Sequence, residues 1–304
     1  MTGTRFAHTA LLYASAAEYL DTAVTYVRAA RDEDRPVLVA VPGADLERIR
    51  DGVGPGGDVT FWDAEATSRN PGRIIPALLE YCARHPGRRP ALLGQPMWVG
   101  RTGAERSAVI VHEALVNAAM AGVDGTALCP YDIAGLHPDD VHDARRTHPH
   151  LTGAGVAESG AGFAPSAALA EHNRPLPAPA HAAAMAYDAA GGLRLLRRAV
   201  AEHAAAAGLP GERAADLEFV VTELATNTLR HTTGGGTLHL WSDGETLVCQ
   251  VTDGGHLRDP LAGRLPVDPT SERGRGLLLT HQMCDLVQVR TDPTGTAIRV
   301  HMGH

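Results

Sequence analysis

The sequence predicts two domains in series, an α/β domain with a mostly parallel sheet and an α+β layer sandwich. Three observations predict this. Short apolar runs alternate with helical stretches as far as about residue 150. A segment rich in Ala, Pro and Gly follows, and after it two helices precede strands joined by a tight turn. Alternation of strands and helices is typical of parallel sheets, whereas grouped helices and strands are typical of α+β folds.

The first domain contains five apolar runs that we expect to be strands. They are His8–Tyr13, Val37–Val41, Val59–Trp62, Ala91–Gln95 and Thr126–Asp132. Helical periodicity lies between and after them, near 15–31, 44–51, 71–85, 104–121 and 138–147. Because a helix follows each strand, the strands are expected to run parallel with helices on the faces of the sheet.

Residues 158–182 predict a connector between the domains. Pro175, Pro177 and Pro179 alternate, which favours an extended and fairly stiff chain. The Ala-rich part of the segment is also compatible with a short helix packed on either domain. We therefore expect domains at residues 1–157 and 183–304 of this 304-residue chain.

The second domain begins with helices and ends with strands. Helices are expected near 188–207 and 212–231, followed by two strands around Ser242-Asp243-Gly244, a hairpin signal. A loop rich in Gly, Pro and Arg runs over 254–273. A helix near 274–284 and the strands Leu286–Thr291 and Thr296–His301 complete the pattern.

The composition excludes several classes of protein. All 27 cationic residues are arginine. The absence of lysine excludes P-loop NTPases, eukaryotic-type protein kinases and Schiff-base enzymes, which need that amine. The net charge is −8 and neither half has a basic surplus, so direct binding of nucleic acid is not expected.

The same composition predicts a cytoplasmic protein. No apolar run reaches the length of a membrane-spanning helix, and the N-terminus does not read as a secretory signal. The four cysteines are far apart, without metal spacing or a disulfide framework. A reduced compartment fits this usage.

A set of polar and glycine residues in the second half points to phosphate chemistry. Glu223, Asn227 and His231 fall at i, i+4 and i+8 of one predicted helix, beside its apolar stripe. Downstream follow Asp253-Gly254-Gly255 at a strand end, Gly274-Arg275-Gly276 at a helix start, and Gly295-Thr296 before the last strand. Glycines at a helix N-terminus present free amides to an anion.

This ordered set resembles the N box and glycine boxes of the GHKL ATPase superfamily, which has the Bergerat fold. Residues 183–304 most resemble the anti-sigma-factor serine kinases of bacterial partner switching. The resemblance implies ATP and Mg²⁺ as cofactors, and a STAS-type anti-sigma-factor antagonist or a sigma factor as partner. It also suggests a homodimer.

The resemblance assigns roles to individual residues. Glu223 would orient or deprotonate the attacking hydroxyl, Asn227 would coordinate Mg²⁺, and Asp253 would bind the adenine amine. The other nucleotide-binding residues implied are Arg230, His231, Gly255, Arg273, Gly274, Arg275, Gly276 and Thr296.

Two departures from the family keep other functions open. Leu257 stands where a further glycine is frequent, and the segment 256–273 is short and Pro-rich. A non-catalytic, ATP-binding partner-switching regulator is therefore one alternative. An atypical sensor histidine kinase is another, although no His-Glu or His-Asp acceptor pair precedes the domain and His203 is followed by Ala204.

The first half resembles the MEDS sensory domain, a RecA-like fold without a nucleotide site. The matching features are His8 with Leu11-Leu12-Tyr13, Cys129-Pro130-Tyr131-Asp132, and Arg146-Thr147-His148-Pro149. The resemblance implies a sensor for a small organic ligand. His8, Tyr13, Cys129 and Tyr131 are the candidate ligand-binding residues.

Two further signals in the first half carry no site. His137, His142, His148 and His150 are close in sequence but lack a clean i, i+4 pair, so no metal site is expected there. Glu113 and Asn117 repeat the N-box spacing without glycine boxes after them. We interpret this pair as one face of a helix.

Overall fold

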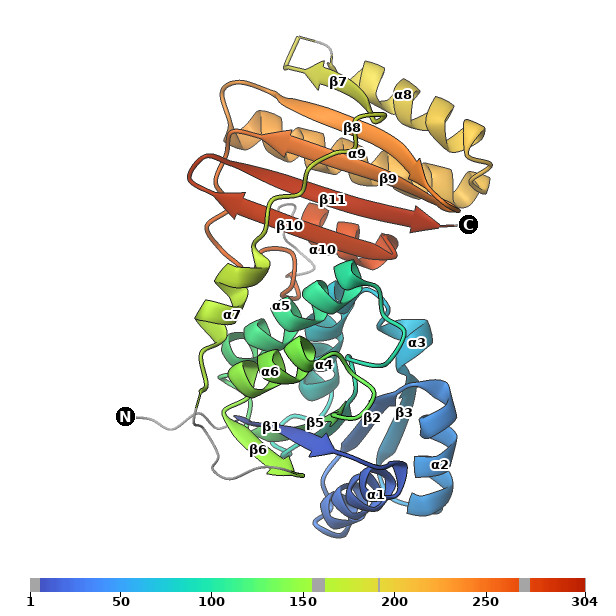
Figure 1. The fold of residues 1–304 in the computed structure, drawn as a ribbon, viewed down its shortest axis with the longest axis vertical. Helices are drawn as coiled ribbons and strands as arrows, with labels where there is room; N and C mark the ends of the chain where they lie inside the picture. Colours follow the sequence, from blue (N-terminus) through green and yellow to red (C-terminus); the bar gives the residue numbers. More distant parts are fainter. Residues whose placement is uncertain (1–5, 155–161, 191, 268–273, 304) are drawn as a thin grey trace. The chain divides into compact units, whose positions relative to one another are not determined.

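The computed structural model describes residues 6–154, 162–190, 192–267 and 274–303 (Figure 1). The chain divides into two compact units, Met1–His172 and Asn173–His304. Within the described ranges, no helix is both long and apolar enough to cross a membrane.

Unit 1 is built on a six-stranded sheet in the order β3-β2-β4-β5-β1-β6. All paired strands run parallel. The strands are β1 (Phe6–Tyr13), β2 (Val37–Val41), β3 (Val59–Asp63), β4 (Ala91–Gly94), β5 (Gly125–Asp132) and β6 (His150–Gly153). The five expected strands are present, and β6 is an addition because its four residues carry no apolar run.

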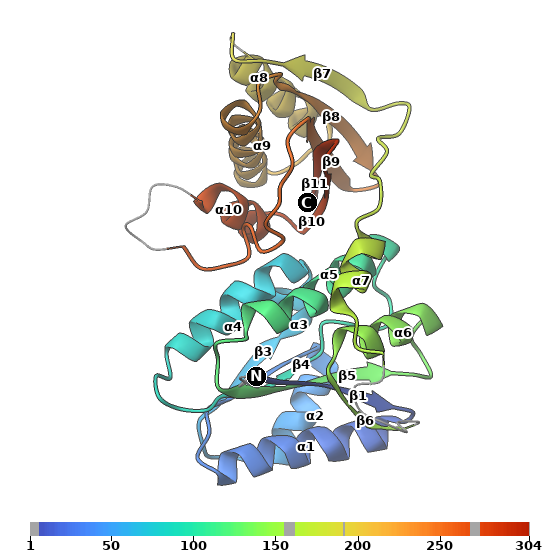
Figure 2. The same ribbon diagram turned by 90° about the vertical axis from the view of Figure 1, so that its left-hand side faces the viewer.

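Helices cover both faces of this sheet, as Figure 2 shows. The pair α1 and α2 lies on one face, and α4, α5 and α6 lie on the other. The helices are α1 (Ala16–Asp32), α2 (Gly43–Val53), α3 (Ala64–Thr67), α4 (Ile74–Ala83), α5 (Gly103–Ala119), α6 (Pro138–Thr147) and α7 (Pro165–His172), with a 3₁₀ turn at Pro71–Arg73.

The helix α5 begins at a capping box. The Thr102 hydroxyl accepts the amide of Glu105, and the Glu105 carboxylate accepts the amide of Thr102. These bonds satisfy two amides that the first helical turn leaves without partners. The start of α5 is thereby fixed, and with it the register of the residues that α5 turns toward the sheet.

Part of the segment expected as a connector is folded onto unit 1. The Ala-rich stretch forms α7, one of the two forms that its sequence allowed. His172 accepts or donates at both ring nitrogens, 2.9 Å from Ser107 Oγ and 2.9 Å from Asp143 Oδ2. Glu171 forms two bonds with Arg146. These contacts dock α7 on α5 and α6.

Unit 2 is built on a five-stranded antiparallel sheet in the order β10-β11-β9-β8-β7. The strands are β7 (Ala183–Tyr187), β8 (Gly236–Asp243), β9 (Thr246–Asp253), β10 (Leu286–Asp292) and β11 (Gly295–Gly303). The β8–β9 hairpin turns at Gly244-Glu245, where Gly244 has φ +59°. The strand β7 is also an addition, since its residues Ala183–Tyr187 lack an apolar alternation.

The helices of unit 2 lie on a single face of its sheet (Figure 2). They are α8 (Gly192–Ala206), α9 (Gly211–His231) and α10 (Arg275–Met283). The apolar stripe of α9 is buried against the sheet, as its helical spacing predicts. This packing fixes which edge of α9 carries the polar N-box residues.

Candidate functional site

The carboxylate and amide of the N box lie one turn apart on α9. Glu223 and Asn227 are half-buried, and they flank Leu224 and Thr228, whose side chains pack into the core. The i, i+4 spacing places both polar groups on the same edge of the helix. The structure therefore keeps them together and partly accessible.

Gly276 brings the start of α10 against this pair. A Cβ atom built on Gly276 would lie 2.7 Å from Glu223 Oε2 and 3.6 Å from Asn227 Nδ2. Real Cβ atoms do not approach an oxygen that closely, so a side chain here would displace the carboxylate. The glycine box at Gly276 thus lies against the N box of Glu223 and Asn227, although two strands and a long loop separate α9 from α10 along the chain.

The α10 N-terminus is suited to an anion. Gly274 is the N-cap residue in the left-handed conformation, φ +87°, and as a glycine it has no side chain with which to cap the helix. The first amides of a helix and its dipole attract negative charge. Arg275 is exposed at the first helical position. Arg273 lies outside the described residues.

Asp253 is held at the end of β9 by two hydrogen bonds. Thr228 Oγ1 donates to Asp253 Oδ2 at 2.7 Å, and the amide of Gly255 donates to Asp253 Oδ1 at 2.8 Å. A carboxylate oxygen can accept two hydrogen bonds and each Asp253 oxygen accepts one of these two, so both oxygens keep a lone pair for a ligand. The orientation of the carboxylate is set before any ligand arrives.

Thr296 connects the last strand to this corner. Its hydroxyl donates to the carbonyl of Gly255 at 2.8 Å and lies 2.8 Å from Thr291 Oγ1. Thr296 also pairs with Asp253 in the β9–β11 register. A Cβ on Gly295 would lie 2.5 Å from the Asp253 carbonyl oxygen, so this close approach requires glycine.

Arg230 and His231 lie at the C-terminal end of α9 and are exposed. Within the described part of the chain, no hydrogen bond or ion pair joins their side chains to the glycine boxes. The structure therefore adds nothing to the roles that the resemblance implies for them.

The arrangement fits ATP and Mg²⁺ by its donor set and its shape. Amide and carboxylate oxygens are ligands that Mg²⁺ accepts in phosphate sites. The absence of a side chain at Gly276 lets the start of α10 approach Glu223 and Asn227 closely, and the first amides of α10 follow Gly274. Asn227 would hold the metal, and the amides of α10 would contact phosphate oxygens.

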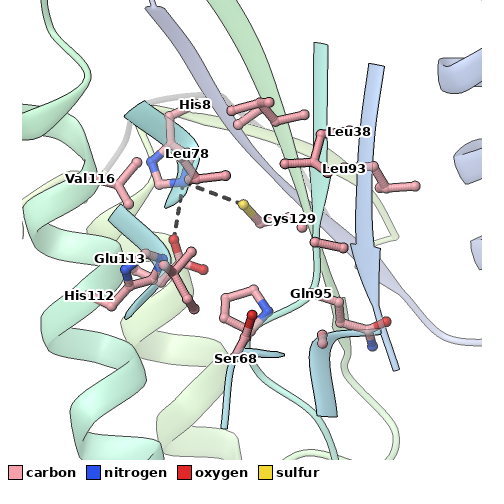
Figure 3. Close-up of a pocket in the computed structure, with 17 residues that line it drawn as sticks. His8, Leu38, Ser68, Leu78, Leu93, Gln95, His112, Glu113, Val116 and Cys129 are labelled. Atoms are coloured by element: carbon pink, nitrogen blue, oxygen red, sulfur yellow. Dashed lines mark hydrogen bonds and ion pairs between the residues drawn. The ribbon is translucent and has the colours of Figure 1, made fainter. Parts of the chain in front are cut away.

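A second group of polar residues lies in unit 1, between the sheet and α5. His8 on β1 and Cys129 on β5 are buried on the same face of the sheet. His8 Nε2 lies 3.1 Å from Glu113 Oε2 and 3.5 Å from Cys129 Sγ, as the dashed lines in Figure 3 mark. His148 Nε2 lies 3.5 Å from the same Glu113 oxygen. We name these four residues the His8 cluster.

Neighbouring groups orient the His8 cluster. Tyr131 Oη donates to Glu113 Oε1 at 2.9 Å. His8 Nδ1 is 3.2 Å from Asn117 Oδ1, and His148 Nδ1 is 2.8 Å from the carbonyl of Ala144. Glu113 and Asn117 share one face of α5, as interpreted, and the structure adds that this face turns inward onto His8 of the sheet.

Burial and charge shift the pKa values of the His8 cluster. Burial raises the pKa of the Glu113 carboxyl, but His148 and His8 outweigh it and lower it to about 2. Burial, followed by the charge of His8, lowers the pKa of His148 to about 3. Burial and Glu113 raise the pKa values of the Cys129 thiol and the Tyr131 hydroxyl. Perturbation of this size is typical of functional sites.

The His8 cluster adjoins a cavity of about 40 Å³. His8, Glu113 and Cys129 line it together with mostly apolar residues such as Leu78 and Val116 (Figure 3). A small cavity with a few convergent polar groups is a typical ligand site. The space admits only a few non-hydrogen atoms in this conformation.

The structure separates Tyr13 from the other candidate sensor residues. Tyr13 stacks on Tyr19 on the opposite face of the sheet, and its hydroxyl accepts a 3.4 Å bond from Gln95. Side chains alternate between faces along a strand, and Tyr13 lies an odd number of residues after His8. The grouping of Tyr13 with His8 is therefore corrected.

Two family models match the chain, and they divide it as the structure does. Residues 7–149 match the model of MEDS, the methanogen/methylotroph, DcmR sensory domain. Residues 186–302 match the histidine kinase-like ATPase domain. The first part of the chain is thus similar to a MEDS domain, and the second part to a histidine kinase-like ATPase domain. The predicted resemblances to a MEDS domain and to a histidine kinase-like ATPase domain are thereby confirmed, in this order along the chain.

Other comparisons add little. No curated protein matches the chain. A solved structure of an ATPase domain is 8% identical, with a TM-score of 0.36, and the match covers 49% of this chain and 69% of that structure. A likeness at this level supports no inference.

Sequence reasoning missed three residues that the two domains place at their sites. Thr228 of the ATPase domain falls at the spacing of the apolar stripe of α9, which predicts burial but no contact with Asp253. Glu113 and His148 of the MEDS domain lie far from Cys129 in sequence, and only the parallel pairing of β1 and β5 brings His8 beside Cys129. The i, i+4 spacing of Glu113 and Asn117 indicates that both lie on one face of α5. It does not indicate which residues that face contacts.

Proposed function

We propose that the protein is an ATP- and Mg²⁺-dependent anti-sigma regulatory factor with protein serine/threonine kinase activity. The observation that supports this best is the convergence of Glu223 and Asn227 on Gly276, with Asp253 oriented by Thr228. The MEDS domain would sense a small ligand and control the output of the ATPase domain. The partner would be a STAS-type antagonist, a sigma factor or both, in a cytoplasmic, homodimeric regulator.

The residues of the ATPase domain would divide the work of phosphoryl transfer. When bound, Mg²⁺-ATP supplies the transferable phosphoryl group and neutralises part of its charge. Asp253 accepts a hydrogen bond from the adenine amine, and the amides after Gly274 bind phosphate oxygens. Glu223 orients the attacking hydroxyl and accepts its proton. Phosphoryl transfer depends mainly on such positioning and charge stabilisation, which arginine and amides supply without lysine.

The experiment combines calorimetry with a transfer assay. Mg²⁺-ATP is titrated into the wild type and into Asn227→Ala, and binding is expected to weaken sharply in the variant. Transfer of labelled phosphate to STAS-type antagonists from the same cell is then compared between the wild type and Glu223→Ala. Unchanged transfer in Glu223→Ala would refute the catalytic role.

A second candidate function is a non-catalytic ATP-binding regulator that works by partner exchange. Leu257 supports it. Its amide already donates to Thr291 Oγ1 at 2.9 Å and to Thr296 Oγ1 at 3.3 Å, where the family often has a glycine beside the nucleotide. Tight ATP binding without transfer to any partner would favour this function, whereas efficient transfer would exclude it.

A further inference from the structure

Four side chains of the MEDS domain direct potential metal ligands to one point. Nε2 of His8, Nε2 of His148, a carboxylate oxygen of Glu113 and Sγ of Cys129 all lie within 4.8 Å of one another. All four side chains are buried. They come from β1, α5, β5 and the residue after α6, so the fold rather than one local motif assembles them.

Hydrogen bonds on the far side of each imidazole fix its tautomer. Asn117 Nδ2 donates to the carbonyls of Glu113 and Thr147, so Asn117 Oδ1 is the atom that accepts from His8 Nδ1. The carbonyl of Ala144 can only accept, so His148 Nδ1 carries a proton as well. In the neutral rings, both Nε2 atoms therefore present lone pairs to the centre of the cluster.

The centre of the cluster thus collects three acceptors, and the donor that faces them is the weak S–H group of Cys129. A proton on His8 Nε2 would form a hydrogen bond with the Glu113 carboxylate. The lone pair of His148 Nε2 would still face that negatively charged carboxylate. His148 is fully buried, and among the described residues its Nε2 has no hydrogen-bond partner. Buried polar atoms normally have partners. A cation at the centre would satisfy all four atoms at once.

The donor set and its spacing select the kind of cation. Two imidazoles, a carboxylate and a thiolate suit Zn²⁺ or a similar transition metal, whereas Ca²⁺ and Mg²⁺ prefer oxygen ligands alone. Metal–ligand bonds of about 2.0–2.3 Å in a tetrahedron place ligand atoms roughly 3.3–3.8 Å apart. Three of the six separations are 3.1, 3.5 and 3.5 Å, close to that range, and the other three are no longer than 4.8 Å.

Charge and surroundings also match. A dication with two neutral imidazoles, one carboxylate and one thiolate forms a neutral group, which a buried site favours. Tyr131 donates to the second oxygen of Glu113, and backbone or amide oxygens hold both Nδ1–H groups. Such outer bonds to the ligands are typical of protein metal sites.

We propose that His8, Glu113, Cys129 and His148 bind one divalent transition-metal ion, with Zn²⁺ as the ion that the donor set favours. Three of the four ligands line the 40 Å³ cavity, so the ion forms the polar end of an otherwise apolar ligand site. On binding, the Cys129 S–H bond breaks, its proton passes to solvent, and the sulfur binds the metal as thiolate.

The test uses Co²⁺ as a spectroscopic probe for Zn²⁺ in the full chain, stripped of metal and without nucleotide. We expect one Co²⁺ per chain, visible d–d bands of a tetrahedral ion, and a near-ultraviolet thiolate-to-cobalt charge-transfer band. Added Zn²⁺ should remove these signals by displacement. Surface histidines that bind Co²⁺ would give no thiolate band, so the band reports this site.

Variants separate the cluster from other thiols. Cys129→Ala should abolish the charge-transfer band, whereas Cys82→Ala, at a half-buried free cysteine of the same domain, should retain it. Glu113→Gln and Cys129→Ser keep the side-chain shape and should weaken Co²⁺ binding at least 10-fold. Circular dichroism confirms that each variant is folded. Absence of the band in the wild type, or its persistence in Cys129→Ala, would overturn the proposal.

Discussion

The hydrogen bond between Thr228 and Asp253 offers a sharp test of the ATP site. Thr228→Val keeps the size and branching of the side chain but removes the hydroxyl that donates to Asp253 Oδ2 at 2.7 Å. Thr228 is buried, so no water readily replaces this donor. Two quantities should change, the free energy of unfolding and the affinity for Mg²⁺-ATP.

The size of each change follows from the structure. A hydrogen bond to a charged acceptor contributes about 1.5–3 kcal/mol, so the free energy of unfolding should fall by that amount. In the variant, ATP must itself fix the Asp253 side chain, which costs about 0.5–1.5 kcal/mol. The dissociation constant should therefore rise roughly 2- to 12-fold.

Thr222→Val is the matched control on the same helix. Both hydroxyls donate to the carbonyl four residues earlier, Thr228 at 3.3 Å and Thr222 at 2.7 Å, but the Thr222 hydroxyl has no bond to Asp253 among the described residues. Urea unfolding gives the stability and titration calorimetry gives the affinity. The control should retain wild-type affinity.

The two readouts separate two errors. If Thr228→Val loses stability but binds ATP as the wild type does, Asp253 does not bind the nucleotide. If neither quantity changes, the hydrogen bond itself contributes nothing, and the reasoning about a preset carboxylate is refuted.

Three further predictions concern single residues at the two sites. Gly276→Ala should leave stability unchanged or raise it by up to about 1 kcal/mol, through helix propensity, yet reduce phosphoryl transfer by displacing Glu223. Tyr131→Phe should lower the free energy of unfolding by about 1.5–3 kcal/mol, because the buried Glu113 carboxylate loses a donor. The metal-free protein should lose stability as pH falls from about 6.5 toward 4.5, with a slope that approaches about 1.4 kcal/mol per pH unit; this window lies above the ordinary pKa of Glu113, 4.5. The cause is His148, whose pKa is lowered to about 3 in the folded state, so that the unfolded state takes up its proton first.

Each of these predictions has a control and a contradicting outcome. For Gly276, the control is Gly211→Ala, at a helix start with open space around it; equal transfer in both variants would exclude the steric argument. For Tyr131, Tyr13→Phe loses a neutral bond and should cost less, so equal losses would contradict the charge argument. For His148, the pH slope should disappear in His148→Gln, and a slope that persists would assign it to another group.

Much of the fold was predictable because each element carries its own signal. Apolar runs between helical stretches predicted β1 to β5, and the stripe on α9 predicted its buried face. The strands β6 and β7 gave no such signal, since they are short or lack apolar alternation and owe their conformation to pairing with β1 and β8. Strand propensity depends on such pairing more than helix propensity does.

Most residues of the candidate ATP site were predictable from the sequence, whereas the His8 cluster was not. Glu223 and Asn227 are one helical turn apart, and glycines mark the places where backbone approaches them. The sequence alone therefore determined the two domains, their order and the residues of the glycine boxes. Only the tertiary structure decided that Gly276 meets Glu223, and that His8, Glu113, Cys129 and His148 share one centre. The physical reason is that strand register and helix packing bring together side chains from distant segments. The spacing of residues within one segment does not determine these contacts.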